Sequence, residues 1–375
     1  MKKQSLSKIT DEICNRVLEL ACEIQQIPAP SFDEGQRADF MEGLFRETGF
    51  EDVWQDDIHN VFAKYPTKSN SPGIVVSAHL DTVFSREVDM TLRKTGGKII
   101  GPGIGDNSVA LASLIGLKWL IDQWPERPDR PLYIVANVCE EGVGNLTGMK
   151  KVVETLGDRV VAYIVLEGLR LGEIVNIAVG SERYRLVAKS KGGHSWLDYG
   201  NDSAIHALVK LTSELLDLKP PVRPKTTFNI GRIEGGISIN TIAGEAQCLL
   251  DIRSENSEAL NEYVCHVTDV IKAHNGREAE IIMEKIGSRP AGNLSQEHHL
   301  IKAAKKALTL AGCPEISCTA SSTDANIPLS QGIPALSIGM THGGNMHTMN
   351  EYIETASLTV GLEQLIHLVD YADRI

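Results

Sequence analysis

Residues 72–81 read Pro-Gly-Ile-Val-Val-Ser-Ala-His-Leu-Asp, a short apolar run that opens after a proline and ends in ionisable residues. A continuous apolar run of this length is typical of a strand buried on both faces, as in a largely parallel sheet. Two further buried strands are expected at 131–138 and 160–166, and a helix at 108–124. Strands that alternate with helices predict an α/β fold.

The alternation of helices and strands extends toward both ends of the chain. An amphipathic helix is expected at 5–26, and Ser31 with Glu34 three residues later fits a capping box that opens a second helix. Beyond residue 290 the predicted elements are a helix at 298–311, a strand at 333–338 and a closing helix at 355–374.

The segment 181–290 differs, because its strands alternate polar and apolar residues. Two strand–helix blocks with one solvated face predict an inserted α+β domain of about a hundred residues. We therefore expect a discontinuous first domain, 1–180 with 291–375, and a second domain at 181–290.

Composition restricts the partners and the compartment. The chain has 375 residues, 42% of them apolar, and 37 Lys and Arg against 49 Asp and Glu give a net charge of −12. Such a surface repels phosphate backbones, so we expect no nucleic-acid partner and no anionic membrane. Seven cysteines without a CxxC pair indicate free thiols in a reducing compartment. With no signal-peptide pattern and no run of 18 apolar residues, we expect a cytoplasmic protein.

The first candidate site is His79-Leu-Asp81, at the carboxyl end of the first buried strand, where open α/β sheets place their ligands. Residues i and i+2 of a strand point the same way, so the Asp81 carboxylate can reach the second imidazole nitrogen of His79, as metal-bound histidines commonly require. Taken alone, the pair equally fits a surface turn.

Other ionisable residues follow strands or stiff turns in the same way. Asp106 ends a glycine-rich turn, Glu140 and Glu141 follow a buried strand, Glu167 ends another, and His347 lies in a glycine-rich loop. Each has an ordinary explanation by itself: a helix cap, a solvated pair, a strand-end charge or a loop histidine.

Together they favour a metal site. Three carboxylates and two imidazoles suit two Zn²⁺-like ions with one bridging carboxylate. Two such ions, roughly 3.5 to 4 Å apart, can generate hydroxide from water and polarise a carbonyl. Glu140 is then free to carry the proton. The candidate ligands are His79, Asp106, Glu141, Glu167 and His347.

The chain resembles the metallopeptidase M20 family, which includes glutamate carboxypeptidase, succinyl-diaminopimelate desuccinylase, acetylornithine deacetylase, aminoacylase-1 and peptidase T. The motifs are Ile27–Ser31, Ala78–Val83, Gly105–Asn107, Glu140-Glu141, Asp251–Arg253 and His347–Glu351. The resemblance implies a zinc-exopeptidase-like three-layer catalytic domain with an inserted ferredoxin-like lid and dimerisation domain.

It also implies roles for individual residues. Asp106 bridges the two metals, His79 and Glu167 complete one shell, and Glu141 and His347 complete the other. Asp81 orients His79, and Glu140 is the general base.

In the lid, Lys191–Ser195 matches the family's histidine motif, in which the imidazole of His194 comes from the neighbouring subunit of a homodimer to stabilise the oxyanion. Asn240 and Arg253 match substrate-contacting positions, and the arginine often holds a free carboxylate. Thr323 lies in a segment that resembles the family's loop near the substrate backbone. Without the family, a surface histidine, a turn asparagine and a strand-end ion pair explain the first three equally well.

We therefore expect a di-zinc hydrolase, with cobalt or manganese as alternative metals, that cleaves a short peptide or an N-acyl amino acid. A catalytically inactive, metal-stabilised binding or scaffold protein of the same fold is the alternative, but Asp81 and Glu140 are not needed merely to hold metal. Glu167 resembles the carboxypeptidase and deacylase branches, whereas the loop Ser322–Pro328 resembles peptidase T-like members. The choice among aminopeptidase, carboxypeptidase and deacylase stays open, as does the side chain or acyl group accepted.

Overall fold

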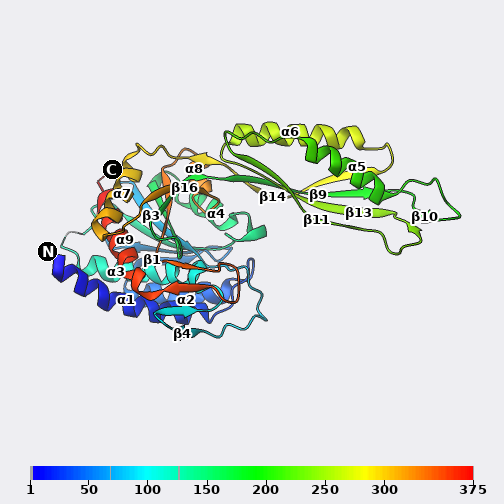
Figure 1. Ribbon diagram of the computed structural model, residues 1–375. Helices are drawn as coiled ribbons and strands as arrows, with labels where there is room; N and C mark the ends of the chain where they lie inside the picture. The colour runs from blue at the N-terminus through cyan, green and yellow to red at the C-terminus, as the bar shows by residue number, and fades with distance from the viewer. Residues whose placement is uncertain (1–2, 68, 126, 375) are drawn as a thin grey trace. The chain divides into compact units, whose positions relative to one another are not determined.

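The computed structural model describes residues 3–67, 69–125 and 127–374, and the chain divides into two compact units. The first unit comprises Met1–Ala178 and Asn293–Ile375, and the second comprises Val179–Gly292. Both chain ends therefore belong to the first unit (Figure 1). Each unit has its own hydrophobic core.

The first unit is built on a nine-stranded sheet with the order β1-β2-β6-β3-β7-β17-β8-β15, and β16 pairs with β8. Its four central neighbours β6, β3, β7 and β17 are parallel, but β1, β2 and the β17–β8 pair are antiparallel. The sheet is therefore mixed, whereas we expected a largely parallel one. The strands are β1 (Glu51–Gln55), β2 (Val61–Tyr65), β3 (Gly73–His79), β6 (Leu132–Asn137), β7 (Val160–Glu167), β8 (Glu173–Ala178), β15 (Gly292–Asn293), β16 (Ser317–Ser321) and β17 (Ala335–Gly339).

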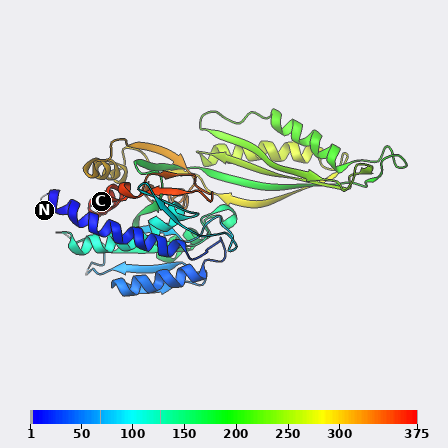
Figure 2. The ribbon, with the colours of Figure 1, turned by 60° about the horizontal axis from the view of Figure 1, so that its bottom comes forward.

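Helices cover both faces of this sheet, which makes three layers. Ile74 and Val76 of β3 belong to the core under α1, α2, α3, α7 and α9, while Val75 belongs to the core under α4 and α8. Figure 2 shows α1 beside α3, and the two helices are in contact. The helices are α1 (Lys3–Gln25), α2 (Gly35–Thr48), α3 (Val109–Gln123), α4 (Thr147–Leu156), α7 (His299–Ala311), α8 (Asn326–Ser330) and α9 (Leu358–Ala372).

One helical segment, Ile104–Gln123, is long and apolar enough to cross a membrane by length and composition. The most apolar stretch of this segment is 94% buried inside the structure. It packs against α1 and α9, as the core helix of an α/β domain does.

A small antiparallel sheet of the first unit joins distant parts of the chain. Its order is β18-β19-β5-β4, with β4 (Arg93–Thr95), β5 (Lys98–Ile100), β18 (Gly343–Gly344) and β19 (Tyr352–Glu354). The pairing of Tyr352 with Ile100 brings the turn after β5 next to the loop before β19. These two segments carry Asp106 and His347.

The second unit is an α+β sandwich, as its alternating strands predict. Four antiparallel strands in the order β11-β13-β9-β14 carry α5 and α6 on one face (Figure 1). A two-stranded ribbon, β10 with β12, extends from it. The elements are β9 (Gly180–Lys189), β10 (Gly193–His194), α5 (Ala204–Asp217), β11 (Thr226–Gly235), β12 (Thr241–Ile242), β13 (Glu245–Ser254), α6 (Ser257–His274) and β14 (Glu280–Arg289).

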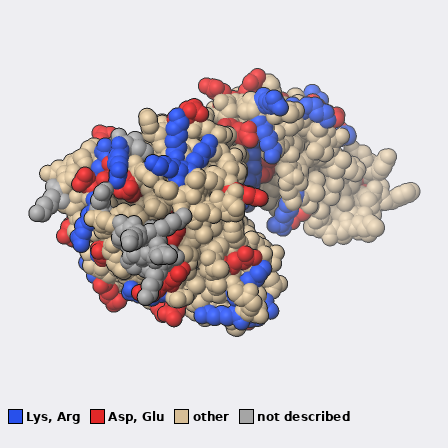
Figure 3. All heavy atoms as spheres, turned by 60° about the vertical axis from the view of Figure 1, so that its left-hand side comes forward, with Lys and Arg blue, Asp and Glu red and all other residues tan. Residues whose placement is uncertain are grey.

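The surface is of mixed charge on the face that Figure 3 displays. Lys and Arg side chains lie there among Asp and Glu side chains, and neither sign forms a continuous tract. All seven cysteines are free thiols.

Candidate metal centre

Four neighbouring parallel strands deliver ionisable side chains to one edge of the sheet. His79 is the last residue of β3 and Glu167 the last residue of β7. Glu140 and Glu141 follow β6, and His347 lies beyond β17, in the loop between β18 and β19. Because these strands are parallel neighbours, their carboxyl ends meet, which is where open α/β sheets bind ligands.

Asp106 lies between two of these side chains. It belongs to the turn η1 (Ile104–Ser108) ahead of α3 and is 7% exposed. Its Oδ1 lies 3.0 Å from Nε2 of His79, and its Oδ2 lies 3.0 Å from Nε2 of His347. One carboxylate therefore faces two imidazoles, one with each oxygen.

Each imidazole has a second carboxylate neighbour. The Oε2 atom of Glu167 lies 3.9 Å from Nε2 of His79, and Oε1 of Glu141 lies 3.2 Å from Nε2 of His347. The five residues therefore form two halves that share Asp106. The structure brings together all five residues that the sequence nominated as ligands.

The spacing of these atoms suits divalent cations. Two ligands bound tetrahedrally at 2.0–2.1 Å from one zinc ion lie about 3.3 Å apart. The nitrogen–oxygen distances of 3.0–3.9 Å are of this size, and ligand atoms of His79, Asp106 and Glu141 all lie within 4.8 Å of one another. Imidazole nitrogens and carboxylate oxygens are also the donors that zinc-like ions prefer.

A close backbone contact brings Asp106 to the sheet edge. A Cβ atom on Gly168 would lie 1.7 Å from the carbonyl oxygen of Gly105. Only glycine therefore lets the end of β7 approach the η1 turn this closely. The approach places Asp106 and Glu167 in one site.

Asp81 contacts both sides of the centre. Its backbone carbonyl oxygen lies 3.0 Å from Nδ1 of His79, while its carboxylate Oδ1 lies 3.5 Å from the same nitrogen. The carboxylate accepts hydrogen bonds from the backbone N–H groups of Glu140 and Glu141, each at 2.9 Å, and from the Ser31 hydroxyl at 2.7 Å. Asp81 therefore anchors the glutamate pair as well as the histidine.

Burial and hydrogen bonding shift the pKa values of Asp106 and of the ionisable side chains around it. Hydrogen bonding to Asp106 and then to Glu141 raises the pKa of His347 to about 10. Burial opposes charging of His79, but its hydrogen bonds with Asp106 and Asp81 hold its pKa above the ordinary value. For Asp106, burial opposes ionisation, yet hydrogen bonds from the two histidines hold its pKa well below the usual range. Burial raises the pKa of Glu167 to about 8, although the nearby His79 lowers it.

The capping box proposed at Ser31 and Glu34 is wrong. Neither side chain caps α2, because the Ser31 hydroxyl donates to Asp81 and Glu34 accepts a hydrogen bond from the backbone N–H of Cys139 at 3.1 Å. Both side chains instead support the loop that carries the glutamate pair. Their partners are 50 and 105 residues away in sequence, which a local pattern cannot reveal.

The sequence also gave no signal for Arg37, whose guanidinium is fully buried. It donates to the backbone carbonyl oxygens of Ile27 at 2.9 Å and Leu80 at 2.8 Å. Burial lowers its pKa to about 10, against the favourable charges of Asp81 and Glu34. Arg37 therefore supplies positive charge beneath an acidic site.

The residues expected to contact the substrate belong to different units of the chain. Thr323 belongs to the first unit, is 6% exposed, and its hydroxyl lies 2.7 Å from that of Ser337. In the second unit His194 and Asn240 are exposed neighbours, because the backbone N–H of Ser195 donates to the Asn240 carbonyl oxygen at 3.0 Å.

Arg253 is not brought to these two residues. β13 begins at Glu245, next to the ribbon, and Arg253 lies eight residues further along this strand. At ~3.4 Å per residue, the two positions are about 27 Å apart. Its Nε donates to Oδ2 of Asp251 at 2.7 Å, and Arg183 binds the other oxygen of that carboxylate. Arg253 is thus engaged by a neighbour on its own strand.

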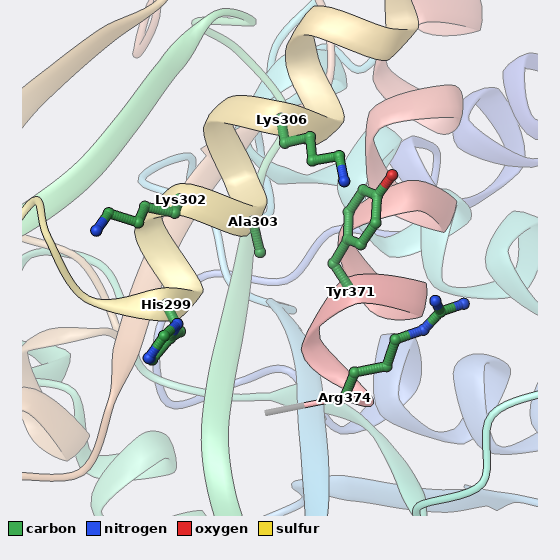
Figure 4. A pocket seen from close by; sticks show the side chains of 6 residues that line it. All are labelled: His299, Lys302, Ala303, Lys306, Tyr371 and Arg374. Carbon is green, nitrogen blue, oxygen red and sulfur yellow. The ribbon is translucent and has the colours of Figure 1, made fainter.

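The pocket shown in Figure 4, between α7 and α9, is not this centre. It has a volume of about 350 Å³, and none of the described residues that line it is Asp or Glu. Lys306 lies over the Tyr371 ring, 4.3 Å from its centroid, whereas Lys302 points away and pairs with Glu297 at 2.8 Å. Its basic groups do not converge on one point. The lining residues are His299, Lys302, Ala303, Lys306, Tyr371 and Arg374.

Comparison with known sequences identifies the relatives of the chain. Residues 75–371 match the profile of "Peptidase family M20/M25/M40". The uncharacterized protein YqjE of Bacillus subtilis is 24% identical, over 95% of this chain and 98% of its own length. Acetylornithine deacetylase of Shigella sonnei is 24% identical over 80% of each chain. A probable carboxypeptidase of Aspergillus flavus is 26% identical, but the match spans only 52% of its length.

Solved structures share the fold. Aminopeptidase PepT of Bacillus cereus superimposes with a TM-score of 0.80 at 21% identity, covering 96% of this chain and 98% of its own. A tripeptidase of Staphylococcus aureus gives a TM-score of 0.81 at 22% identity over 96% and 99%. The Bacillus subtilis protein YXEP, described as a dinuclear metal binding peptidase, gives 0.71 at 18% identity over 96% and 98%.

Proposed function

The chain belongs to the peptidase family M20/M25/M40 and is a hydrolase, and on that premise we propose that it is a two-metal enzyme that cleaves an amide bond of a short peptide. The observation that carries this proposal is the position of Asp106. Each of its oxygens lies 3.0 Å from a different imidazole, as a carboxylate shared by two metal ions requires. A deacylase acting on an N-acyl amino acid is the second candidate, favoured by the match to acetylornithine deacetylase over 80% of the chain.

In this proposal His79 and Glu167 would hold one ion, His347 and Glu141 would hold the other, and Asp106 would contribute to both. Zinc fits this donor set, with cobalt or manganese as alternatives. When bound, such ions polarise a carbonyl and lower the pKa of water. The dinuclear centre named for YXEP supports the count of two.

Glu140 is the proposed general base. It is 7% exposed and adjacent to Glu141, and its backbone is fixed by the 2.9 Å hydrogen bond to Asp81. A carboxylate held in this way can take a proton from the attacking water and deliver it to the leaving nitrogen. Because Glu140 is not one of the five ligands, it can change its protonation state without releasing a metal.

His194 is the proposed oxyanion donor. The backbone N–H groups of Trp196 and Leu197 both point to its Nδ1 at 3.2 Å. Nδ1 therefore accepts and the ring hydrogen lies on Nε2, which can donate to a developing negative charge. Asn240, beside it, is proposed to bind the substrate.

We further propose a homodimer formed through the second unit, with His194 serving the partner's centre. Large apolar side chains close to His194 and Asn240 in sequence are strongly exposed, which favours a protein surface that becomes covered. They are Trp196, Leu197, Tyr199, Ile237 and Ile239.

Arg253 remains a proposed carboxylate-binding residue with a competing structural role. Its Nε is committed to Asp251, which leaves the two Nη groups for a ligand. Thr323 is proposed to contact the substrate through its backbone loop, since its hydroxyl is bonded to Ser337.

The seven free thiols favour a reducing compartment, so we propose a cytoplasmic location. Fractionation of the native cell, with the chain detected by antibody, tests this proposal. Recovery mainly outside the cytoplasm would refute it.

A chromatographic screen tests the proposed activity. Dipeptides, tripeptides, their C-terminal amides, and N-acetyl or N-succinyl amino acids would be incubated with protein loaded with zinc, cobalt or manganese. We expect release of a single amino acid from free peptides, abolished by chelation. The Glu140→Ala protein, loaded in the same way, is the matched control, and equal product from both proteins would exclude catalysis by this centre.

A further inference from the structure

A buried carboxylate outside the ligand set contacts two of the loops that build the centre. Glu351 immediately precedes β19 and is 0% exposed. Its Oε1 accepts hydrogen bonds from the backbone N–H groups of Gly105 at 2.7 Å and Asp106 at 2.9 Å. Its Oε2 accepts one from the backbone N–H of His347 at 3.2 Å.

Backbone pairing with the β5 segment fixes the position of Glu351. β19 pairs with β5, and the backbone N–H of Gly101 donates to the Glu351 carbonyl oxygen at 2.8 Å. The carboxylate therefore spans from the turn after β5 to the loop after β18. These two segments lie more than 240 residues apart in sequence.

We propose that Glu351 is a positioning residue that sets Asp106 and His347 relative to each other, and hence shapes one metal site more than the other. The inference rests on the proposed two-metal function. Glu351 binds the backbone of His347, whose imidazole meets Asp106 at 3.0 Å and Glu141 at 3.2 Å. Within the described part of the chain its carboxylate bonds to the backbone of Gly105, Asp106 and His347, and to neither His79 nor Glu167.

The substitution Glu351→Gln separates the two contacts. The amide oxygen can still accept from Gly105 and Asp106, but the amide NH₂ group faces the N–H of His347, and two donors cannot bond. Asp106 should stay in place while the His347 loop is released. Loss of a group that orients a metal ligand typically weakens binding by about 10- to 100-fold.

Titration of metal-stripped protein with zinc, in competition with a chromogenic chelator, measures the two sites. We expect wild type to bind two ions and Glu351→Gln to bind one with unchanged affinity and one about 10- to 100-fold more weakly. Glu354→Gln is the matched control, because Glu354 lies only three residues further on, at the end of β19, is half-exposed and pairs with Lys98 at 3.3 Å. It should bind both ions as wild type does.

A double-mutant cycle shows whether Glu351 acts through His347. His347→Ala should lose the same site, and adding Glu351→Gln should not weaken the remaining ion further. Unchanged binding of both ions by Glu351→Gln, or equal weakening of both, would overturn the inference. If wild type itself binds no metal, the proposed function fails instead.

Hydrogen exchange in the wild-type protein needs no variant. The amide hydrogens of Gly105, Asp106 and His347 should exchange slowly, because all three are bonded to a buried acceptor. Fast exchange at His347, comparable with that of the exposed residues beside it, would contradict the assignment even if the Glu351→Gln protein failed to fold.

Discussion

Asp81 serves two partners with two different groups. Its backbone carbonyl oxygen is the nearer neighbour of His79, and its carboxylate holds the amides of Glu140 and Glu141. The sequence predicted only the first connection, through the side chain. The second connection follows from β3 and β6 being parallel neighbours, which ends both strands at the same level.

The glutamate pair offers a direct test of the proposed roles. Glu140→Ala should keep both metal ions and lose about 10²- to 10⁴-fold in kcat, because a proton shuttle contributes that much. Glu141→Ala should instead lose metal. Turnover and metal content measured on both proteins decide the matter. Wild-type kcat in Glu140→Ala would show that another group carries the proton.

Metal affinity should rise with pH. His347 has a pKa raised to about 10 and Glu167 a pKa raised to about 8, so at pH 7 both hold protons that a cation must displace. Binding therefore releases protons, and affinity increases as pH rises toward 8. Calorimetric titration in buffers of different ionisation enthalpy counts the released protons. A count of zero, with affinity independent of pH, would contradict the electrostatics described for the site.

At the scale of elements, the approach of β7 to the η1 turn sets the position of Asp106. Gly168→Ala would place a methyl group against the carbonyl oxygen of Gly105, which is backbone and cannot turn aside. We expect a loss of about 1 to 3 kcal/mol in the free energy of unfolding, with weakened metal binding.

Denaturant unfolding of the metal-stripped protein measures this change. Gly43→Ala in α2 is the matched control, since nothing lies within 4 Å of its added methyl group. It should be neutral or stabilise by up to about 1 kcal/mol. Equal stability of the two variants would mean that the β7 approach is not tightly constrained.

Elements with a strong periodic signal could be predicted from sequence, and short ones could not. The apolar run at 73–78 and the amphipathic helix expected at 5–26 match the observed β3 (Gly73–His79) and α1 (Lys3–Gln25) within a few residues. Strands β4, β5, β18 and β19 have two or three residues, too few to show an alternation. Yet β5 and β19 bring Asp106 and His347 together.

The ligand candidates could be found because each follows a strand or a rigid turn in the sequence. Their supports could not, since the partners of these supports lie far along the chain. Ser31 donates to the Asp81 carboxylate, whereas Glu34 and Glu351 accept from the backbone N–H groups of Cys139 and Gly105. Local rules assigned Ser31 and Glu34 to a helix cap. The fold instead gives each a longer-range partner, and the partner of Glu34 is a buried backbone amide that needs an acceptor within the protein.

At the scale of the whole molecule, the dimer proposal predicts complementation between inactive proteins. His194→Ala and Glu140→Ala should each be inactive alone. If His194 acts in the partner's centre, a mixed dimer contains one centre with both residues intact, and activity should reappear after subunit exchange. Exchange would be verified with two differently tagged chains. Activity that stays absent despite verified exchange would place His194 in its own subunit's chemistry or outside it.

The central claim is that Asp106 is shared by two metal ions, and the number of ions bound per chain tests it most directly. Zinc-saturated wild-type protein, freed of unbound metal and analysed by mass spectrometry of the element, should contain close to two ions per chain. Asp106→Ala should lose affinity at both positions, because each half of the centre uses one of its oxygens. A wild-type content of one ion or none at saturation would contradict the account.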